Sequence, residues 1–146
     1  MPILVMNSPT SPDAPTLDAF LDGAFHLFQP SRSGFRAGHD ALLLAACVER
    51  DMQGHAIDMG AGAGAVSFAS AVRAPALSLT LAEQNPLMTE LAERSCGLEA
   101  NRAFAGRLDV RCLDLLGPRA QREAVNLQDA TFDLVLTNPP FHPAGT

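Results

Sequence analysis

The sequence predicts an α/β domain in which a mostly parallel sheet is covered by helices on both faces. A chain of 146 residues, 47% hydrophobic and 18% charged, is typical of one globular domain with a real core. From residue 55 onward, short apolar stretches with alternating polarity are followed by stretches with helical spacing. A chain that alternates strands and helices in this way generally builds a parallel sheet, because each helix carries the chain back to the start of the next strand.

Charge and apolar content weigh against several function classes. The net charge of −6 does not favour a nucleic-acid-binding surface, because proteins that neutralise phosphates usually carry a basic face. No apolar stretch reaches the roughly 18 residues of a membrane helix. The N-terminal stretch "MPILVMNSPTSPDAP" lacks the basic start and long apolar middle of a signal peptide. We therefore expect a cytoplasmic protein with no membrane partner.

The three cysteines, Cys47, Cys96 and Cys112, are odd in number and widely spaced in apolar surroundings. This pattern argues against a disulfide framework and against a zinc site. We expect them to be buried as small hydrophobic residues, and we expect no metal site.

The N-terminal third contains one clear helix. Residues 1–17 show no periodicity and are expected to form a mobile arm. Residues 24–30 are expected to form a short strand that Pro30 ends, and residues 31–40 a loop that contains glycine. Asp40 is the expected N-cap of a helix over "ALLLAACVER", which the break at Gly54 follows.

The rest of the chain predicts strands and helices in turn. Strands are expected at 55–59, 76–83, 107–114 and 132–138, and the first connecting helix at 64–73. A second helix has Asn85 as its N-cap and Pro86 at its first position, and its end is left open between Gly97 and Arg102. Residues 115–130 are polar and are expected to include a short helix.

Polar or glycine residues follow each predicted strand. In parallel sheets, ligands bind at the carboxyl ends of the strands. The residues at those ends are Asp58, Gly60, Gly62, Gly64, Glu83, Asp114 and Asn138. Closely spaced glycines let the backbone turn sharply and approach a ligand. Glu83 follows at a distance from which an acidic side chain can accept hydrogen bonds from ribose hydroxyls, so a nucleoside-type ligand is expected; a solvated charge at the strand end is the alternative.

The stretch "DMGAGAGA" leaves two cofactors open. The pattern also satisfies a dinucleotide fingerprint, so an oxidoreductase that uses a nicotinamide dinucleotide is possible. A carboxylate at Asp58 suits a ligand that bears a sulfonium or ammonium cation better than it suits a pyrophosphate, which favours S-adenosylmethionine. Alternatively, Asp58 orients the glycine loop by accepting backbone N–H bonds.

The motifs "DMGAGAG", Glu83, Asp114 and "NPPF", in this order and spacing, resemble class I S-adenosylmethionine-dependent methyltransferases that act on nitrogen. The resemblance covers about residues 20–146 and implies a Rossmann-like fold. It implies that the glycine loop holds the methionine end of the cofactor, that Glu83 binds the ribose and that Asp114 contacts the adenine amino group.

The stretch "FQPSRSGFRAGHDALLLAA" is similar to the segment that precedes the core in bacterial tRNA adenine-N6 methyltransferases of the small-domain type. By this resemblance, residues 18–54 cover the cofactor, with Phe35, Arg36 and Asp40 as contacts, and residues 55–146 are the cofactor-binding core. His39 departs from the small hydroxyl residue expected there and is interpreted as a loop residue.

The "NPPF" motif suits methyl transfer to a planar amino group. Such a nitrogen is a poor nucleophile because its lone pair is delocalised, so orientation must compensate. The side-chain oxygen of Asn138 and the carbonyl of Pro139 can each accept one N–H, and Pro139 and Pro140 hold these acceptors still. Phe141 offers an aromatic face to a base. No metal or general base is required before transfer.

The acceptor stays open at this stage. The order of preference is N6 of adenine in tRNA or other RNA, N2 of guanine in ribosomal RNA, and the glutamine amide of a protein. Four arginines could form a modest basic rim for RNA, or be solvated surface charges: Arg32, Arg36, Arg119 and Arg122. Family members extend the sheet beyond this motif, so the sheet is expected to be incomplete at the C-terminus. A binding module or inert remnant is the rival interpretation for this piece.

Overall fold

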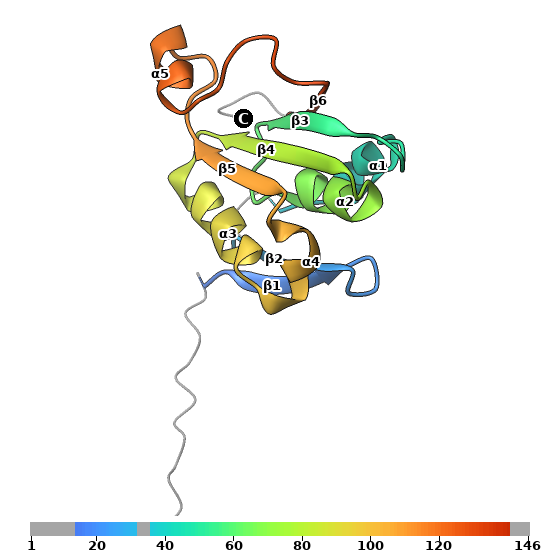
Figure 1. Ribbon diagram of the computed structural model, residues 1–146. Helices are drawn as coiled ribbons and strands as arrows, with labels where there is room; N and C mark the ends of the chain where they lie inside the picture. Colours follow the sequence, from blue (N-terminus) through green and yellow to red (C-terminus); the bar gives the residue numbers. More distant parts are fainter. Residues whose placement is uncertain (1–13, 32–35, 141–146) are drawn as a thin grey trace, which may run out of the picture.

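The computed structural model describes residues 14–31 and 36–140 of the chain. In chain order the elements are β1 (Thr16–Phe20), β2 (Phe25–Gln29), α1 (His39–Ala46), β3 (Gly54–Met59), α2 (Ala65–Arg73), β4 (Leu77–Glu83), α3 (Pro86–Cys96), the 3₁₀ turn η1 (Glu99–Asn101), α4 (Arg102–Ala105), β5 (Leu108–Cys112), α5 (Arg119–Ala124) and β6 (Leu134–Thr137). Strands β3 to β6 form one sheet in the order β5-β4-β3-β6, and within the described residues β1 pairs only with β2. Figure 1 shows three layers: this sheet, then helices α1 to α3, then the hairpin.

The four-stranded sheet is parallel throughout, which confirms the predicted α/β class. Side chains of a strand alternate between the two faces, so Leu77, Leu79 and Leu81 of β4 share one face and are fully buried there. They pack in one core with Phe68 of α2 and Leu91 of α3. This face is therefore closed by helices, as the sequence predicts.

The opposite face of the sheet is covered more thinly than expected. A small cluster of Ile57, Ala82, Leu113 and Leu127 lies there. The helix in this region, α5, has no buried residue. On β6, Val135 of this face is 57% exposed. The irregular segment after β5, rather than a packed helix, covers the part of this face near the middle strands.

The hairpin β1–β2 lies outside the parallel sheet and packs against α3. Phe25 and Leu27 of β2 belong to the main core. Two side chains supply hydrogen-bond partners to β2: the Asn101 Oδ1 atom accepts the His26 N–H at 2.9 Å, and the Ser95 hydroxyl oxygen accepts the Phe28 N–H at 2.9 Å. The expected strand near residues 24–30 is confirmed, whereas β1 was not anticipated. Thr16 and Leu17 lie in β1, so the expected arm 1–17 is wrong at its C-terminal end; residues 1–13 lie outside the described residues.

Helix boundaries differ from the predictions at both ends of α1. Helix α1 begins at His39 with Gly38 as its N-cap, so Asp40 is a first-turn residue and the prediction that it caps the helix is wrong. The same helix ends at Ala46, before the predicted "CVER" end. Helix α3 has the predicted cap, because the Asn85 side chain accepts the Leu87 N–H, and it ends at Cys96. The short elements η1 and α4 that follow were not anticipated.

The expectation of buried cysteines is wrong for Cys47 and Cys112, which are exposed, whereas Cys96 is half-buried. Cys47 directly follows α1, and Cys96 and Cys112 are the last residues of α3 and β5. At the end of a helix or strand, apolar neighbours in the sequence do not ensure burial. Within residues 14–31 and 36–140, every helix is too short or too polar to span a lipid bilayer.

Candidate functional site

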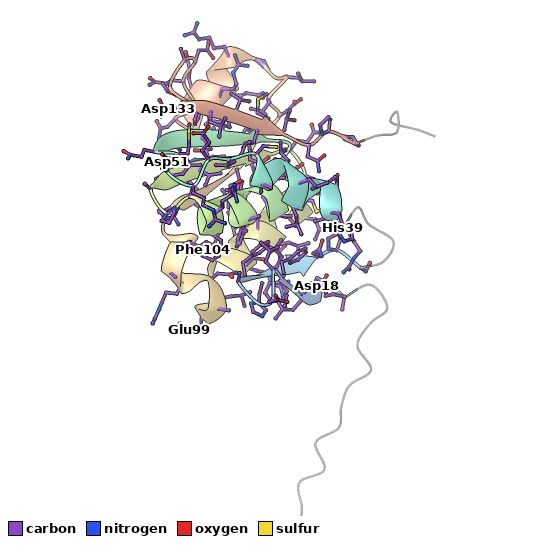
Figure 2. All side chains as sticks on the ribbon, turned by 90° about the vertical axis from the view of Figure 1, so that its right-hand side faces the viewer. Asp18, His39, Asp51, Glu99, Phe104 and Asp133 are labelled. Carbon is purple, nitrogen blue, oxygen red and sulfur yellow. The ribbon has the colours of Figure 1, made fainter. Side chains whose placement is uncertain are left out.

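The strand register brings the predicted strand-end residues to one edge of the sheet. Met59 of β3 is aligned with Ala82 of β4 and with Thr137 of β6. Gly60, Glu83 and Asn138 directly follow these aligned residues, so the three lie in one row at the edge where the strands end. Figure 2 shows Asp51 and Asp133 at the other end of the strands and His39, the neighbour of Asp40, at this end.

The glycine loop has the backbone conformation that glycine alone adopts easily. Gly60, Gly62 and Gly64 have φ values of +74°, +57° and +101°. A Cβ atom on Gly60 or Gly62 would meet no atom within 4 Å, whereas one on Gly64 would lie 2.9 Å from Leu81 Cδ2. Gly60 and Gly62 thus face open space where a ligand can approach, and Gly64 permits the close packing of α2 on β4.

Glu83 ties the glycine loop to the start of α3. Its Oε2 atom accepts the Gly62 N–H at 2.8 Å, and its Oε1 atom accepts the Asn85 N–H at 2.8 Å. The carboxylate is half-buried and is not a freely solvated charge. Each oxygen of an ionised carboxylate has two lone pairs, so both can still accept a further hydroxyl hydrogen bond.

Asp58 faces helix α2. Its side chain is 1% exposed, and its Oδ2 atom accepts the Ser67 hydroxyl at 2.7 Å. Burial raises the pKa of Asp58 to about 6; hydrogen bonds from the Ser67 hydroxyl and backbone oppose this rise, and the Glu83 charge adds to it. The carboxylate therefore contacts the first turn of α2, and hydrogen bonds from backbone N–H groups of the glycine loop to Asp58 stay a prediction.

Asn138 contacts the helix that precedes the core. Its Nδ2 atom donates to Asp40 Oδ2 at 2.8 Å, which joins residues 98 positions apart. This hydrogen bond is the main cause of the lowered pKa of Asp40. The Thr137 hydroxyl donates to the Met59 carbonyl at 3.0 Å and fixes β6 to β3 beside the motif. Pro139 and Pro140 are exposed, and Phe141 and Phe35 lie outside the described residues.

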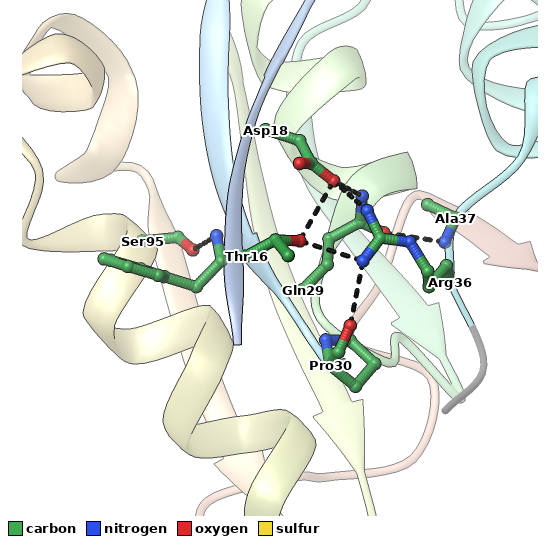
Figure 3. A network of polar contacts seen from close by, with 8 residues as sticks. Thr16, Asp18, Gln29, Pro30, Arg36, Ala37 and Ser95 are labelled. Atoms are coloured by element: carbon green, nitrogen blue, oxygen red, sulfur yellow. Dashed lines mark hydrogen bonds and ion pairs between the residues drawn. The ribbon is translucent and has the colours of Figure 1, made fainter. Parts of the chain in front are cut away.

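Two other predicted site residues have local partners. Asp114 is exposed, and its Oδ1 atom accepts the Leu116 N–H at 2.9 Å within its own turn. Arg36 donates to Thr16 Oγ1 at 2.8 Å and to the Pro30 carbonyl at 2.9 Å, and it pairs with Asp18 (Figure 3). The Arg36 side chain therefore holds the hairpin to the segment before α1, and its contact with a cofactor stays a prediction.

The expected basic rim is largely neutralised within the chain. Arg36 pairs with Asp18, and Arg119 pairs with Glu123 at 2.7 Å. Arg122 pairs with Asp129 at 3.9 Å and also donates to the Gly117 carbonyl at 3.0 Å. Arg32 lies outside the described residues. Among the residues that the structure describes, nowhere do three or more His, Cys, Asp or Glu side chains gather closely enough to hold a metal ion.

Sequence reasoning missed Ser67 and Thr137 as supports of the site. Ser67 lies in the first turn of α2, nine residues after Asp58, and a polar residue at that point of a small-residue helix was the available signal. Thr137 directly precedes Asn138, and its role depends on the β3–β6 pairing, which the local sequence does not reveal.

Comparison of the sequence with known protein families identifies the family of this chain. Residues 33–146 match the family described as Methyltransferase small domain. The chain belongs to this family. The match includes the glycine loop, Glu83, Asp114 and the "NPPF" motif, so the resemblance inferred from the sequence is confirmed.

Two curated relatives show how much of a longer protein the chain spans. It is 29% identical over 113 residues to the tRNA1(Val) (adenine(37)-N6)-methyltransferase of Flavobacteriaceae bacterium (strain 3519-10), covering 77% of this chain and 44% of that protein. It is 29% identical to the Ribosomal RNA small subunit methyltransferase C of Klebsiella pneumoniae, covering 77% of this chain and 28% of that protein. The chain thus spans less than half the length of these relatives.

A solved structure shares the fold. A protein named as a predicted O-methyltransferase from Agrobacterium tumefaciens matches with a TM-score of 0.64 and 39% identity, over 70% of this chain and 49% of that one. The likeness confirms the Rossmann-like arrangement of the sheet.

Proposed function

We propose that this chain is the cofactor-binding part of an S-adenosylmethionine-dependent N-methyltransferase that acts on RNA. The observation that carries the proposal is the row of Gly60, Glu83 and Asn138 at one sheet edge. At neighbouring strand ends, a glycine loop and a carboxylate can bind a nucleoside-type methyl donor, and an amide can bind an amino acceptor in the same site. Membership of the Methyltransferase small domain family supports methyl transfer over the nicotinamide alternative.

The residues present fit S-adenosylmethionine. The space at Gly60 and Gly62 leaves room for a ligand against the backbone. Glu83 keeps unused lone pairs for ribose hydroxyls, and Asp114 is exposed beside it after β5. We propose these residues, together with Gly64 and Asp58 as supports of the loop, as the cofactor-binding set. When bound, S-adenosylmethionine supplies an electrophilic methyl group on a positively charged sulfur.

Asn138 and Pro139 would orient the acceptor. The Asn138 Nδ2 atom is engaged by Asp40, which leaves the Oδ1 atom to accept an N–H of a planar amino group. The carbonyl of Pro139 would accept the second N–H, and the two prolines restrict the motion of both acceptors. These dipoles would also stabilise the positive charge that develops on the nitrogen. Phe141 is proposed to stack on the base.

We propose N6 of adenine in tRNA as the acceptor. Support comes from the relative named as a tRNA1(Val) adenine-N6 methyltransferase and from the similarity of residues 28–46 to the corresponding segment of such enzymes. Guanine N2 in ribosomal RNA is the second candidate, because a relative named as a ribosomal RNA methyltransferase matches over a similar share of the chain. We also propose that the protein acts in the cytoplasm, which the RNA-modifying relatives support.

A methyl-transfer assay on the purified chain tests this proposal. Calorimetry with S-adenosylhomocysteine should give a dissociation constant in the micromolar range, and Glu83→Gln should weaken it about tenfold, because the ribose loses a carboxylate acceptor. Transfer of a tritiated methyl group to bulk tRNA should yield N6-methyladenosine after nuclease digestion, and Asn138→Ala should reduce it roughly 100-fold.

Control variants and the product decide between the candidates. Glu90→Gln removes an exposed charge from α3 and should leave binding and transfer unchanged. Cofactor binding without transfer to RNA or protein would support the non-catalytic module instead. Label recovered in N2-methylguanosine, in protein or in a methylated hydroxyl group would overturn the adenine assignment, and absence of cofactor binding would overturn the whole proposal for this chain.

A further inference from the structure

The side-chain amide of Asn138 has two chemically different ends, and only one of them can serve the proposed reaction. An N–H of the acceptor needs the Oδ1 atom, whereas the Nδ2 atom would repel it. In the described ranges 14–31 and 36–140, the hydrogen bond to Asp40 is the single one that the Asn138 side chain makes. The orientation of this amide therefore depends on its contact with Asp40.

An ionised carboxylate accepts hydrogen bonds and donates none. The Asp40 Oδ2 atom, 2.8 Å from the Asn138 amide, can therefore be satisfied only by the NH₂ end. If the amide turned by 180°, two oxygens would face each other. The pKa of Asp40 is lowered, mainly by this hydrogen bond and also by backbone N–H groups and the neighbouring His39, so the carboxylate is ionised at neutral pH.

Asp40 is itself held in place. It lies in the first turn of α1, where the partial positive charge of the helix N-terminus favours a carboxylate. The helix is anchored by Ala41 and Ala45, which are 3% and 2% exposed. Gly38, its N-cap, makes room for the carboxylate, since a Cβ atom there would lie 2.8 Å from Asp40 Oδ1.

We infer that Asp40 is a positioning residue that fixes the orientation of the Asn138 amide, so that its oxygen faces the acceptor nitrogen. This inference rests on the proposed function. It gives Asp40 a role different from the cofactor contact expected from the sequence resemblance. Asp40 acts through Asn138 and has no contact of its own with the reacting atoms.

The test compares the wild-type chain with Asp40→Asn, which keeps the size of the side chain and loses its obligatory acceptor character. The asparagine can donate to the Asn138 oxygen, so the reactive orientation is no longer enforced. We expect kcat for methyl transfer to fall about tenfold, with the dissociation constant of S-adenosylhomocysteine unchanged within about twofold. Asp51→Asn removes an exposed carboxylate far from the motif and should change neither quantity.

A second variant disturbs the hydrogen bond between Asp40 and Asn138 without changing either residue. Gly38→Ala should displace the carboxylate and lower kcat in the same direction, again with cofactor affinity retained. Wild-type kcat in Asp40→Asn would overturn the inference, and so would a large loss of cofactor affinity with normal kcat, because the latter is the signature of a direct cofactor contact.

A spectroscopic measurement separates this inference from the proposed function. In ¹H–¹⁵N spectra, the side-chain NH₂ signals of Asn138 should shift in Asp40→Asn and Gly38→Ala and stay unchanged in Asp51→Asn. If the wild-type chain transfers no methyl group, the proposed function fails for this chain. Unshifted Asn138 signals would then overturn the inference, and shifted signals would support the contact that it requires.

Discussion

The hydroxyl of Ser67 donates a 2.7 Å hydrogen bond to the carboxylate of Asp58, and both side chains are almost completely buried. Asp58 is the penultimate residue of β3, just before the glycine loop, and Ser67 lies in the first turn of the helix that follows the loop. The pair therefore closes the base of the loop.

Ser67→Ala should lower the free energy of unfolding by roughly 1–3 kcal/mol, because it removes the hydroxyl that donates to a buried carboxylate. Denaturant unfolding at pH 7 measures the change. Ser70→Ala is a matched control, since Ser70 is equally buried on the same helix and its hydroxyl has no hydrogen-bond partner among the residues that the structure describes. Its removal should be neutral or slightly stabilising, and an equal loss in both variants would contradict a specific role for the Asp58–Ser67 contact.

The pKa of Asp58 predicts how stability depends on pH. Burial raises this pKa from 3.8 to about 6, so the folded state binds the proton more tightly than the unfolded state does. The contribution of Asp58 to stability is therefore fully present below about pH 4 and is lost as pH rises through about 6, a change of roughly 3 kcal/mol. Asp58→Asn removes the titrating group, so the difference in unfolding free energy between wild type and this variant should vary across that interval. A difference that stays constant between pH 4 and pH 7 would contradict the raised pKa.

Gly60 and Gly64 of the loop should respond differently to alanine. Gly64→Ala forces a methyl group against Leu81 at a φ of +101°, and should cost about 2–3 kcal/mol of stability. Gly60→Ala adds a methyl group in open space and should cost only about 1 kcal/mol, from the positive φ. It should nevertheless weaken binding of S-adenosylhomocysteine, because the methyl group occupies the space proposed for the ligand. Thermal unfolding and calorimetry on both variants check this, and unchanged affinity in Gly60→Ala would argue against a ligand at that surface.

Local sequence patterns were sufficient to predict the parallel sheet and the residues at the carboxyl ends of its strands. Alternating leucines defined β4, and the Asn85-Pro86 pair defined the start of α3, because these signals lie within a few residues of the structure they specify. The same patterns could not reveal that Asp40 bonds to Asn138, since this contact joins distant parts of the chain. They also missed β1, because "TLDAF" is short and follows a stretch without periodicity, and none of its five residues is buried. Arg36 was assigned from resemblance alone, and its hairpin partners lie in that unexpected strand.

Asn101 is the residue on which we expect the attachment of the hairpin to depend most. It is fully buried, and its side chain makes three hydrogen bonds: Oδ1 accepts the His26 N–H at 2.9 Å, and Nδ2 donates to the His26 carbonyl at 2.7 Å and to the Ser95 carbonyl at 2.8 Å. The Asn101 side chain therefore satisfies both the N–H and the carbonyl of His26, as the backbone of a neighbouring strand would. Asn101→Ala should cost roughly 3 kcal/mol, because buried backbone groups lose their partners.

Asn101→Asp separates the role of the donors from that of the acceptor. The carboxylate keeps an acceptor for the His26 N–H, but it faces two carbonyl oxygens and would be buried as a charge. The loss of unfolding free energy at pH 7 should therefore match or exceed that of Asn101→Ala. At acidic pH the loss should shrink, because the carboxyl group is protonated. Hydrogen exchange at the His26 and Phe28 amides should accelerate in both variants, while the amides of β3 and β4 keep their protection if the hairpin opens as a separate unit. Uniform acceleration across the sheet would mean instead that hairpin and sheet unfold together, since β2 contributes Phe25 and Leu27 to the main core.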